Sequence, residues 1–304
     1  MKKFITLIVV FALPFLVLFL LNEYYCRNMT TFAVKKDYLE KNCNAIEVLI
    51  LGSSHSQNGI NPEFLNKKSC NLAFGSQAIS MDYFLLDKYI DKMPKLKIVL
   101  MEVSPFRFYG DHDITKFNGY IYSNIYKINY KQSSLSLKNY SLVLSNYKYF
   151  TSIFYDYLNP YSYKYFVNAQ GFVTNDFNDR FDKLKYDSIK INQSFSMEHS
   201  FENKELFRMN DLFMKKLIRK CNAKKVKVIL LSTPVYKTYQ NKIPVNAIME
   251  VDSLLHKYQI EFGVKSIDFS ENKDFNIYDY KNDNHLNSNG AKKLTKKIDS
   301  LLLQ

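Results

Sequence analysis

The chain has 304 residues, of which 47% are hydrophobic and 23% are charged, and its formal net charge is +13. This composition supplies enough apolar surface for a large buried core and excludes an intrinsically disordered chain. The positive charge by itself is compatible with nucleic-acid binding, but the lysines are spread along the chain and form no arginine-rich tract. We therefore expect no nucleic-acid partner, and a basic surface that faces anionic lipids or acidic glycans instead.

The N-terminus has the pattern of a membrane anchor. Residues 4–21 are apolar except for Thr6 and Pro14, and Lys2 and Lys3 precede them. Such a run spans about 27 Å as a helix, close to the hydrocarbon thickness of a bilayer, and the lysines favour a cytoplasmic N-terminus. No small-residue cleavage site follows the run, so we expect an uncleaved anchor at 1–22 rather than a signal peptide. The rest of the chain would then face the periplasm or the cell exterior.

The four cysteines, Cys26, Cys43, Cys70 and Cys221, have spacings that match no zinc pattern. Outside the cytoplasm a disulfide is allowed, and Cys43 with Cys70 is the expected pair, with unpaired buried thiols as the alternative. Residues 111–113 (Asp-His-Asp) have metal-ligand spacing but lack further ligands nearby, which favours a surface loop. We expect no metal site and no cofactor.

An alternation of apolar strands and helices begins after a polar linker or stalk at 23–45. The expected strands are 46–51, 71–74, 97–103, 226–231 and 264–269, and the expected helices are 79–93, 201–221, 245–258 and 288–303. Alternation of this kind predicts an α/β domain at 46–304, with a parallel sheet covered by helices on both faces. A tyrosine-rich stretch at about 106–192 interrupts the pattern, and we interpret it as a long helical insertion.

Short polar segments follow the predicted strands, at Gly52–Ser56, Gly75–Gln77, 104–105 and 232–234. Because ligands of a parallel sheet bind at the carboxyl ends of its strands, we expect these segments to converge on one crevice. The loop that carries Asp283 and His285 precedes the last helix and is expected over the same crevice. The substrate contacts predicted from this arrangement are His55, Gln77, Ser104 and Thr233.

Ser54, His285 and Asp283 are the residue types that a nucleophilic hydrolase needs. A neutral serine requires a base within hydrogen-bond reach, and His285 would supply it. Asp283 would orient the imidazole and stabilise its protonated form. The backbone N–H groups of Ser54 and Gly75 would stabilise the oxyanion, each donor being worth about 3 kcal/mol.

The segments Gly52-Ser53-Ser54, Asn71 with Gly75, and 283–290 (Asp-Asn-His-Leu-Asn-Ser-Asn-Gly) together resemble the motif blocks of the SGNH/GDSL hydrolase superfamily. The similarity is greatest to its membrane-anchored cell-envelope members, including D-alanyl-lipoteichoic-acid transfer proteins and polysaccharide acetyl-handling proteins. The resemblance implies a flavodoxin-like three-layer α/β/α fold. It also implies the roles given above to Ser54, His285, Asp283 and Gly75.

Three positions depart from the family pattern. Ser53 stands where the family has Asp, and Asn282 stands three residues before the histidine, where the family's carboxylate usually lies. The third block is replaced by residues 102–105 (Glu-Val-Ser-Pro), which leaves no side-chain oxyanion donor assigned. The sequence therefore predicts a membrane-anchored serine esterase or acyltransferase whose partner is an envelope glycan or an acylated carrier. The alternative is a non-catalytic glycan-binding or assembly factor that works with other envelope-biosynthesis proteins.

Overall fold

The computed structural model describes residues 1–110, 117–128, 136–159, 166–174, 179–194, 201–271 and 273–303. The chain forms two compact units. The first combines Met1–Asp37 with Asp113–Lys164, and the second combines Tyr38–His112 with Tyr165–Gln304. The expected insertion is thus divided between the two units. The surface loop predicted at residues 111–113 lies outside the described residues.

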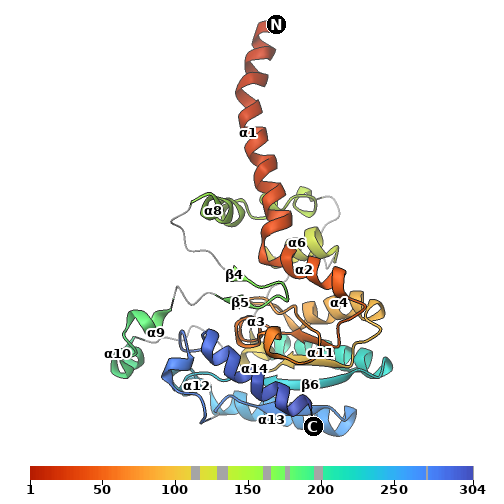
Figure 1. The fold of residues 1–304 in the computed structure, drawn as a ribbon, viewed down its shortest axis with the longest axis vertical. Helices are drawn as coiled ribbons and strands as arrows, with labels where there is room; N and C mark the ends of the chain where they lie inside the picture. The colour runs from red at the N-terminus through yellow and green to blue at the C-terminus, as the bar shows by residue number, and fades with distance from the viewer. Residues whose placement is uncertain are drawn as a thin grey trace. The chain divides into compact units, whose positions relative to one another are not determined.

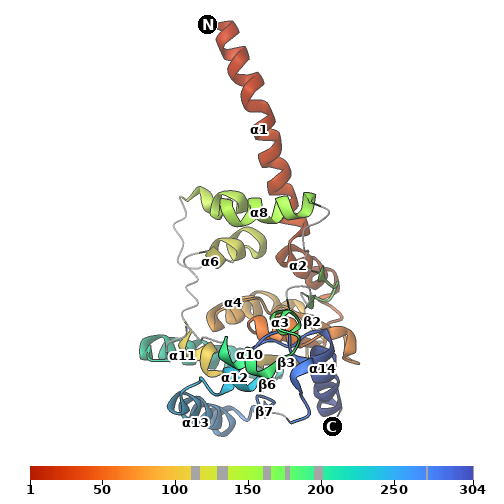
Figure 2. The same ribbon diagram turned by 90° about the vertical axis from the view of Figure 1, so that its left-hand side faces the viewer.

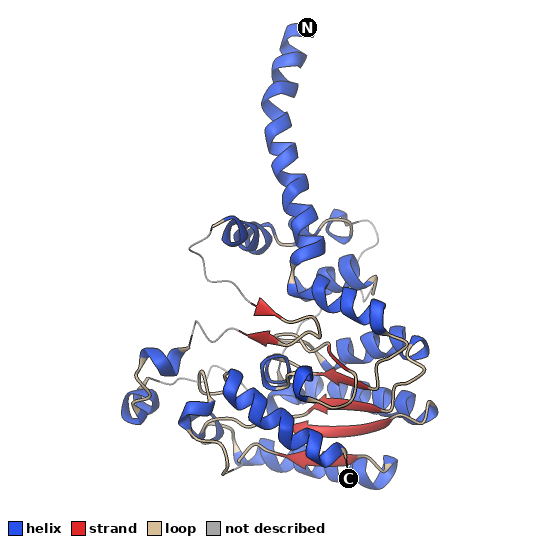
Figure 3. Ribbon diagram, in the orientation of Figure 1, coloured by secondary structure: helices blue, strands red, loops and turns tan. Residues whose placement is uncertain are grey.

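The second unit is built on a five-stranded parallel sheet (Figure 3). Its strands are β1 (Val48–Leu51), β2 (Ser69–Asn71), β3 (Ile98–Glu102), β6 (Lys227–Ser232) and β7 (Lys265–Asp268). Their order in the sheet is β2-β1-β3-β6-β7. If the five strands of this sheet are numbered one to five along the chain, their order is 2-1-3-4-5, which is the order of flavodoxin-like folds. The predicted fold class is therefore confirmed.

Helices cover both faces of this sheet. Figure 2 shows α4 (Ile79–Tyr89), α11 (Lys204–Ala223) and α13 (Val245–Phe262) on one side and α14 (Ser288–Leu302) on the other. The strands β1 and β3 are buried along their whole length, which explains why they form nearly continuous apolar runs in the sequence. Alternate strand residues, including Val48, Ile50 and Leu100, share a core cluster with Leu294 and Ile298 of α14.

Shorter elements complete the second unit: α3 (Ser54–Gly59), η1 (Pro62–Phe64), η2 (Ile90–Lys92), α5 (Pro105–Tyr109), β4 (Phe166–Val167), β5 (Val173–Thr174), α9 (Arg180–Lys183), α10 (Ser188–Gln193), α12 (Lys237–Gln240) and η6 (Ile277–Asp279). The helix α2 (Thr31–Asn42) belongs partly to each unit. The predicted strand 71–74 begins earlier than expected, as β2. Its later residues still continue the ladder, because the N–H groups of Leu72 and Phe74 bond to Ile50 and Gly52.

The first unit contains the long helix α1 (Lys2–Met29) (Figure 1). With it are α6 (Phe117–Ile121), the π-helical turn η3 (Tyr122–Tyr126), η4 (Leu137–Asn139), α7 (Leu142–Ser145) and α8 (Tyr147–Leu158). Among the described residues, α1 is the one helix long and apolar enough to cross a bilayer, a property that signal sequences share. Its residues from Phe4 to Leu18 are largely exposed to solvent.

None of the four cysteines forms a disulfide, so the expected disulfide between Cys43 and Cys70 is wrong. Cys70 lies buried within β2. Cys43 is partly exposed after α2, and its Sγ lies 3.5 Å from the Glu40 carbonyl oxygen. The alternative, buried thiols without a disulfide, describes Cys26, Cys70 and Cys221, whereas Cys43 is partly exposed.

Candidate active site

The turn after β1 is shaped by a glycine that no other residue replaces without strain. Gly52 has φ of +142°, and a Cβ built on it would lie 2.6 Å from the Cβ of Glu102. Its N–H donates to Oδ1 of Asp82 at 3.0 Å. The close approach of Glu102 and the positive φ both require glycine at this position.

Glu102, the last residue of β3, holds the start of α3. Its Oε2 accepts the N–H groups of Ser53 at 2.7 Å and Ser56 at 3.0 Å, and its Oε1 accepts the Ser53 hydroxyl at 2.6 Å. Burial opposes ionisation of Glu102, but positive charge on His55 and Arg107 and the bonds from Ser53 outweigh it and lower its pKa. The carboxylate therefore fixes the backbone on both sides of Ser54.

Ser54 and His285 meet although 231 residues separate them. Nε2 of His285 lies 2.7 Å from Oγ of Ser54. Ser54 is the first residue of α3, and His285 comes from the loop before α14. The structure thus places the expected nucleophile and base within direct hydrogen-bond distance.

Asn282 faces the other nitrogen of this ring. Its Oδ1 lies 3.0 Å from Nδ1 of His285 and also accepts the N–H groups of His285 at 2.9 Å and Asn284 at 3.2 Å. Two backbone donors identify this atom as the amide oxygen, so Nδ1 must carry the proton that it donates to Asn282. Nε2 is then unprotonated and accepts the Ser54 hydroxyl, which is the tautomer that a general base needs.

Asp283 does not orient His285, which corrects the prediction made from its spacing. One oxygen of Asp283 forms an ion pair with Arg180, and the other accepts the Thr238 hydroxyl. Its backbone oxygen accepts the N–H of Tyr236 at 2.8 Å. Asp283 therefore connects the loop that carries His285 to α9 and α12, and both of its carboxylate oxygens are bonded to residues of these helices.

The pKa of His285 is well below its ordinary value. Burial is the main cause, and positive charge on His55 and Lys281 acts in the same direction. The His55 ring centroid is 5.2 Å from that of His285. Nδ1 of His55 lies 3.3 Å from the hydroxyl oxygen of Thr233, and both residues are buried. The structure thus brings two predicted substrate contacts, His55 and Thr233, to the side of the base.

Gly75, the predicted oxyanion donor, has its N–H occupied. Oε1 of Gln57 in α3 accepts this N–H at 2.7 Å. A Cβ built on Gly75 would have no heavy atom within 4 Å, so packing does not require glycine there. The other predicted donor, the N–H of Ser54, sits at the first position of a helix, where no helical acceptor exists. The oxyanion roles of both residues stay predictions.

Gln77 and Ser104 have structural partners. Gln77 is 1% exposed, and its side chain donates to Asp82 and to the Leu72 carbonyl, so we correct its assignment as a substrate contact. Ser104 caps α5 and accepts the N–H of Arg107 at 3.3 Å. Its substrate role stays a prediction.

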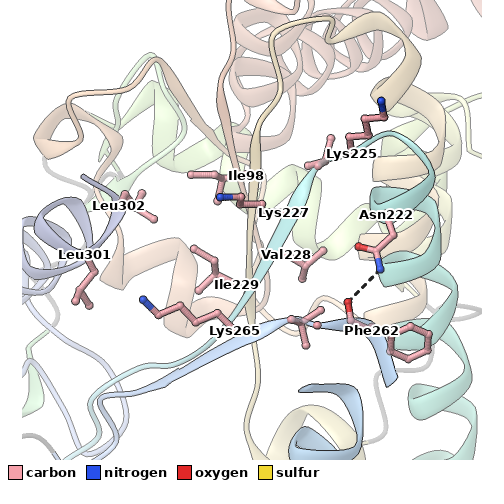
Figure 4. Close-up of a pocket in the computed structure, with 13 residues that line it drawn as sticks. Ile98, Asn222, Lys225, Lys227, Val228, Ile229, Phe262, Lys265, Leu301 and Leu302 are labelled. Carbon is pink, nitrogen blue, oxygen red and sulfur yellow. Dashed lines mark hydrogen bonds between the residues drawn. The ribbon is translucent and has the colours of Figure 1, made fainter. Parts of the chain in front are cut away.

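Within the residues that the structure describes, no three His, Cys, Asp or Glu side chains gather as metal ligands. A cavity of about 640 Å³ lies at the far end of the strands from Ser54 (Figure 4). Its lining includes Ile98 and Lys227, at the first positions of β3 and β6, and Lys265, at the start of β7. The cavity therefore lies at the amino ends of these strands, away from the candidate active site.

Four residues at the site were not predicted as functional: Asn282, Glu102, Gln57 and Arg180. Asn282 occupies the family position of the carboxylate, and this placement was the signal that could have identified it. Glu102 is a charged residue that ends an otherwise apolar strand, which is a weaker signal. Nothing in the sequence near Gln57 or Arg180 indicates their partners, because these contacts depend on the folded structure.

No family model and no curated protein matches this chain. Among solved structures, it is similar to a GDSL-like lipase from Bacteroides thetaiotaomicron, at 12% identity and a TM-score of 0.42, over 89% of this chain and 99% of that one. It is also similar to a protein from Bacteroides fragilis described as an acylhydrolase, at 11% identity and a TM-score of 0.42, over 88% of this chain and 96% of that one. At such low values these likenesses do not define the reaction, which has to be inferred from the geometry around Ser54.

Proposed function

We propose that the chain is a membrane-anchored serine esterase or acyltransferase of the SGNH/GDSL type that acts on a cell-envelope glycan. The observation that carries the proposal is the 2.7 Å distance between Nε2 of His285 and Oγ of Ser54. A lone serine at the start of a helix is usually only a cap, but one that faces an unprotonated imidazole nitrogen is equipped as a nucleophile.

In the proposed reaction, Oγ of Ser54 attacks the carbonyl carbon of an ester while its proton passes to Nε2 of His285. The resulting imidazolium donates that proton to the leaving alcohol, and the acyl group remains as an ester on Ser54. Water or a sugar hydroxyl then attacks the carbonyl carbon of this ester as His285 takes its proton, the bond from that carbon to Oγ of Ser54 breaks, and the imidazolium returns the proton to Oγ. Water as the acceptor gives hydrolysis, and a hydroxyl gives transfer.

The location and substrate class are supported by the chain itself. The apolar helix α1 is long enough to hold the protein in a membrane, with the remainder outside the cytoplasm. The net charge of +13 suits a surface that meets anionic lipids or acidic glycans. The partners we propose are therefore the membrane, through α1, an envelope glycan or acylated carrier, and other envelope-biosynthesis proteins.

The test is hydrolysis of a chromogenic acetyl ester by the full chain in detergent. Ser54→Ala and His285→Ala should each abolish turnover, because neither the nucleophile nor the base has a substitute. Ser253→Ala and His256→Ala, at exposed positions of α13, are the matched controls and should keep full activity. Unchanged turnover in both site variants would reject the mechanism.

A second function from another class is favoured by the contact between Gln57 and Gly75. With this N–H bonded to a side chain and a neutral amide behind His285, the unit would bind a glycan or aid assembly without turnover. A fluorophosphonate probe separates the two functions. Labelling that disappears in Ser54→Ala supports the enzyme, whereas a wild-type chain that stays unlabelled supports the binding protein.

A further inference from the structure

The helix α8 carries an exposed aromatic and apolar stripe. Tyr147, Thr151, Tyr155 and Leu158 follow one another at spacings of four, four and three residues, so they share one face of the helix. Tyr147, Tyr155 and Leu158 are 60% exposed or more. This stripe contains no charged residue, and Lys148 and Asp156 lie off it.

This stripe lies next to the end of the apolar run of α1. Nδ2 of Asn22, which directly follows Leu21, is 3.5 Å from the hydroxyl oxygen of Thr151 in the stripe. The Tyr25 ring packs at 4.3 Å from the ring of Tyr157, between centroids. All of these residues belong to the first compact unit. The packing therefore fixes α8 beside the first turn that follows the apolar run.

The same end of α1 also holds the helix before α8. Oε2 of Glu23 accepts the Ser141 hydroxyl at 2.8 Å and the Val143 N–H at 3.0 Å, and its Oε1 accepts the Leu142 N–H at 3.0 Å. The N-terminus of α7 is thereby capped by a side chain of α1. Two independent sets of bonds thus hold the α7–α8 segment at this level of α1.

We infer that the stripe of α8 lies in the interface of the lipid bilayer, so that the first unit binds the membrane surface as well as crossing it. The inference rests on the membrane anchoring proposed above. The four helical steps from Leu21 to Tyr25 cover about 6 Å, and the headgroup region on each side of a bilayer is about 5–8 Å thick. A segment bonded to Asn22 and Tyr25 is therefore at headgroup depth.

The orientation and chemistry of α8 fit this position. Figure 2 shows α8 running crosswise to α1, so a bilayer that α1 crosses has α8 along its plane. Tyrosine is enriched at membrane interfaces, where its ring meets the acyl chains and its hydroxyl meets water. An uncharged stripe of Tyr, Thr and Leu, with Lys148 beside it, is the pattern of a helix lying in the interface.

The chain contains no tryptophan, so a single introduced tryptophan reports its own surroundings. We would reconstitute the full chain in vesicles of phosphatidylcholine and phosphatidylglycerol and measure quenching by lipids brominated near the headgroup. Tyr155→Trp should show blue-shifted emission and quenching at least about twofold stronger than Tyr149→Trp. Tyr149 is the matched control because it lies on the opposite side of α8 from Thr151 and is 40% exposed.

A second reporter on the stripe, Leu158→Trp, should behave as Tyr155→Trp does. Phe15→Trp, within the apolar run, tests membrane anchoring separately, with lipids brominated deep in the acyl chains as the quencher. Quenching of Phe15→Trp without quenching of either stripe reporter would overturn the inference and leave the anchor in place. Equal quenching at positions 149 and 155 would also overturn it. Absence of quenching at position 15 would reject the proposed membrane anchoring. Absence of quenching at both position 15 and position 155 would reject the anchoring and the interfacial position of α8.

Discussion

Oδ1 of Asn282 lies 3.0 Å from Nδ1 of His285, on the side of the ring away from Ser54. An amide at this position holds the ring in the productive tautomer, as a carboxylate would. It carries no charge, however, and so it stabilises the imidazolium that forms during the reaction less than a carboxylate would. His285 is therefore well oriented but weakly supported as a base.

Replacing Asn282 by aspartate should raise ester hydrolysis. All three partners that Oδ1 has in the structure are donors, so a carboxylate keeps them, and the bond to Nδ1–H becomes charge-assisted. The gain of about 1 kcal/mol expected from such a change corresponds to roughly fivefold in kcat/KM. Asn282→Ala should instead lose activity, because nothing then fixes the ring.

The matched control is Asp283→Asn, which weakens the ion pair with Arg180 and leaves the partner of Nδ1 unchanged. We expect this variant to have a lower temperature of unfolding than the wild-type chain and a kcat/KM close to that of the wild type. A folded Asn282→Asp variant that is no faster than the wild-type chain would contradict the assignment of Asn282.

The sequence was sufficient for the fold because each central strand is buried on both faces and therefore forms an uninterrupted apolar run. It was also sufficient for Ser54 and His285, which lie where a strand end and the last loop must meet. It was not sufficient for Asp283. A spacing of two residues gives no information on where a carboxylate points, and its partner Arg180 is 103 residues away in the chain. The packing of α8 on Asn22 and Tyr25 could not be predicted from the sequence either, because those residues show no periodic pattern that indicates a partner.

The activity should persist into mildly acidic solution. The base must be neutral, and the pKa of His285 lies well below the ordinary value of 6.5. The midpoint of the acidic limb of the kcat/KM profile should therefore lie at a pH below about 6.5, where an ordinary histidine titrates. In the unfolded chain this histidine binds its proton near pH 6.5, so its contribution to stability declines as the pH falls from there towards the native pKa.

His55→Gln tests the electrostatic part of that shift. The substitution removes the His55 ring, whose positive charge helps to lower the pKa of His285 and whose centroid lies 5.2 Å from that of the His285 ring. The acidic limb of the kcat/KM profile should therefore move upward, towards pH 6.5. The movement should be partial, because burial is the larger cause and remains. An acidic limb that stays in place or moves downward would mean that His55 carries no charge that His285 senses.

Glu102 should control the stability of the turn that presents Ser54. Glu102→Ala leaves two buried N–H groups and a hydroxyl without their acceptor, which should cost about 3 kcal/mol or more in the free energy of unfolding. Glu102→Gln keeps the shape and should cost less, about 1–3 kcal/mol, since its amide oxygen can still accept the two N–H groups while its NH2 group donates to the Ser53 hydroxyl oxygen instead of accepting from it. Urea unfolding measures both values.

The lowered pKa of Glu102 adds a dependence on pH to this prediction. Its stabilising effect is present above the ordinary glutamate pKa and is lost as the pH falls through the lower native value. The difference in stability between wild type and Glu102→Gln should therefore shrink in strong acid. A difference that stays constant from neutral to strongly acidic solution would show that the ionised carboxylate is not the stabilising form.

Gln57 should compete with substrate for the N–H of Gly75. Its Oε1 accepts that N–H at 2.7 Å, and a carbonyl oxygen is what the oxyanion of a substrate would replace. Gln57→Ala removes the competitor, which should raise kcat/KM by up to about tenfold, the equivalent of one neutral hydrogen bond. Gln57→Glu has nearly the same shape but offers a charged acceptor, which holds the N–H more strongly and should lower kcat/KM. Equal kcat/KM in all three proteins would mean that Gly75 donates to no oxyanion, and Ser54 N–H would then remain as the expected donor.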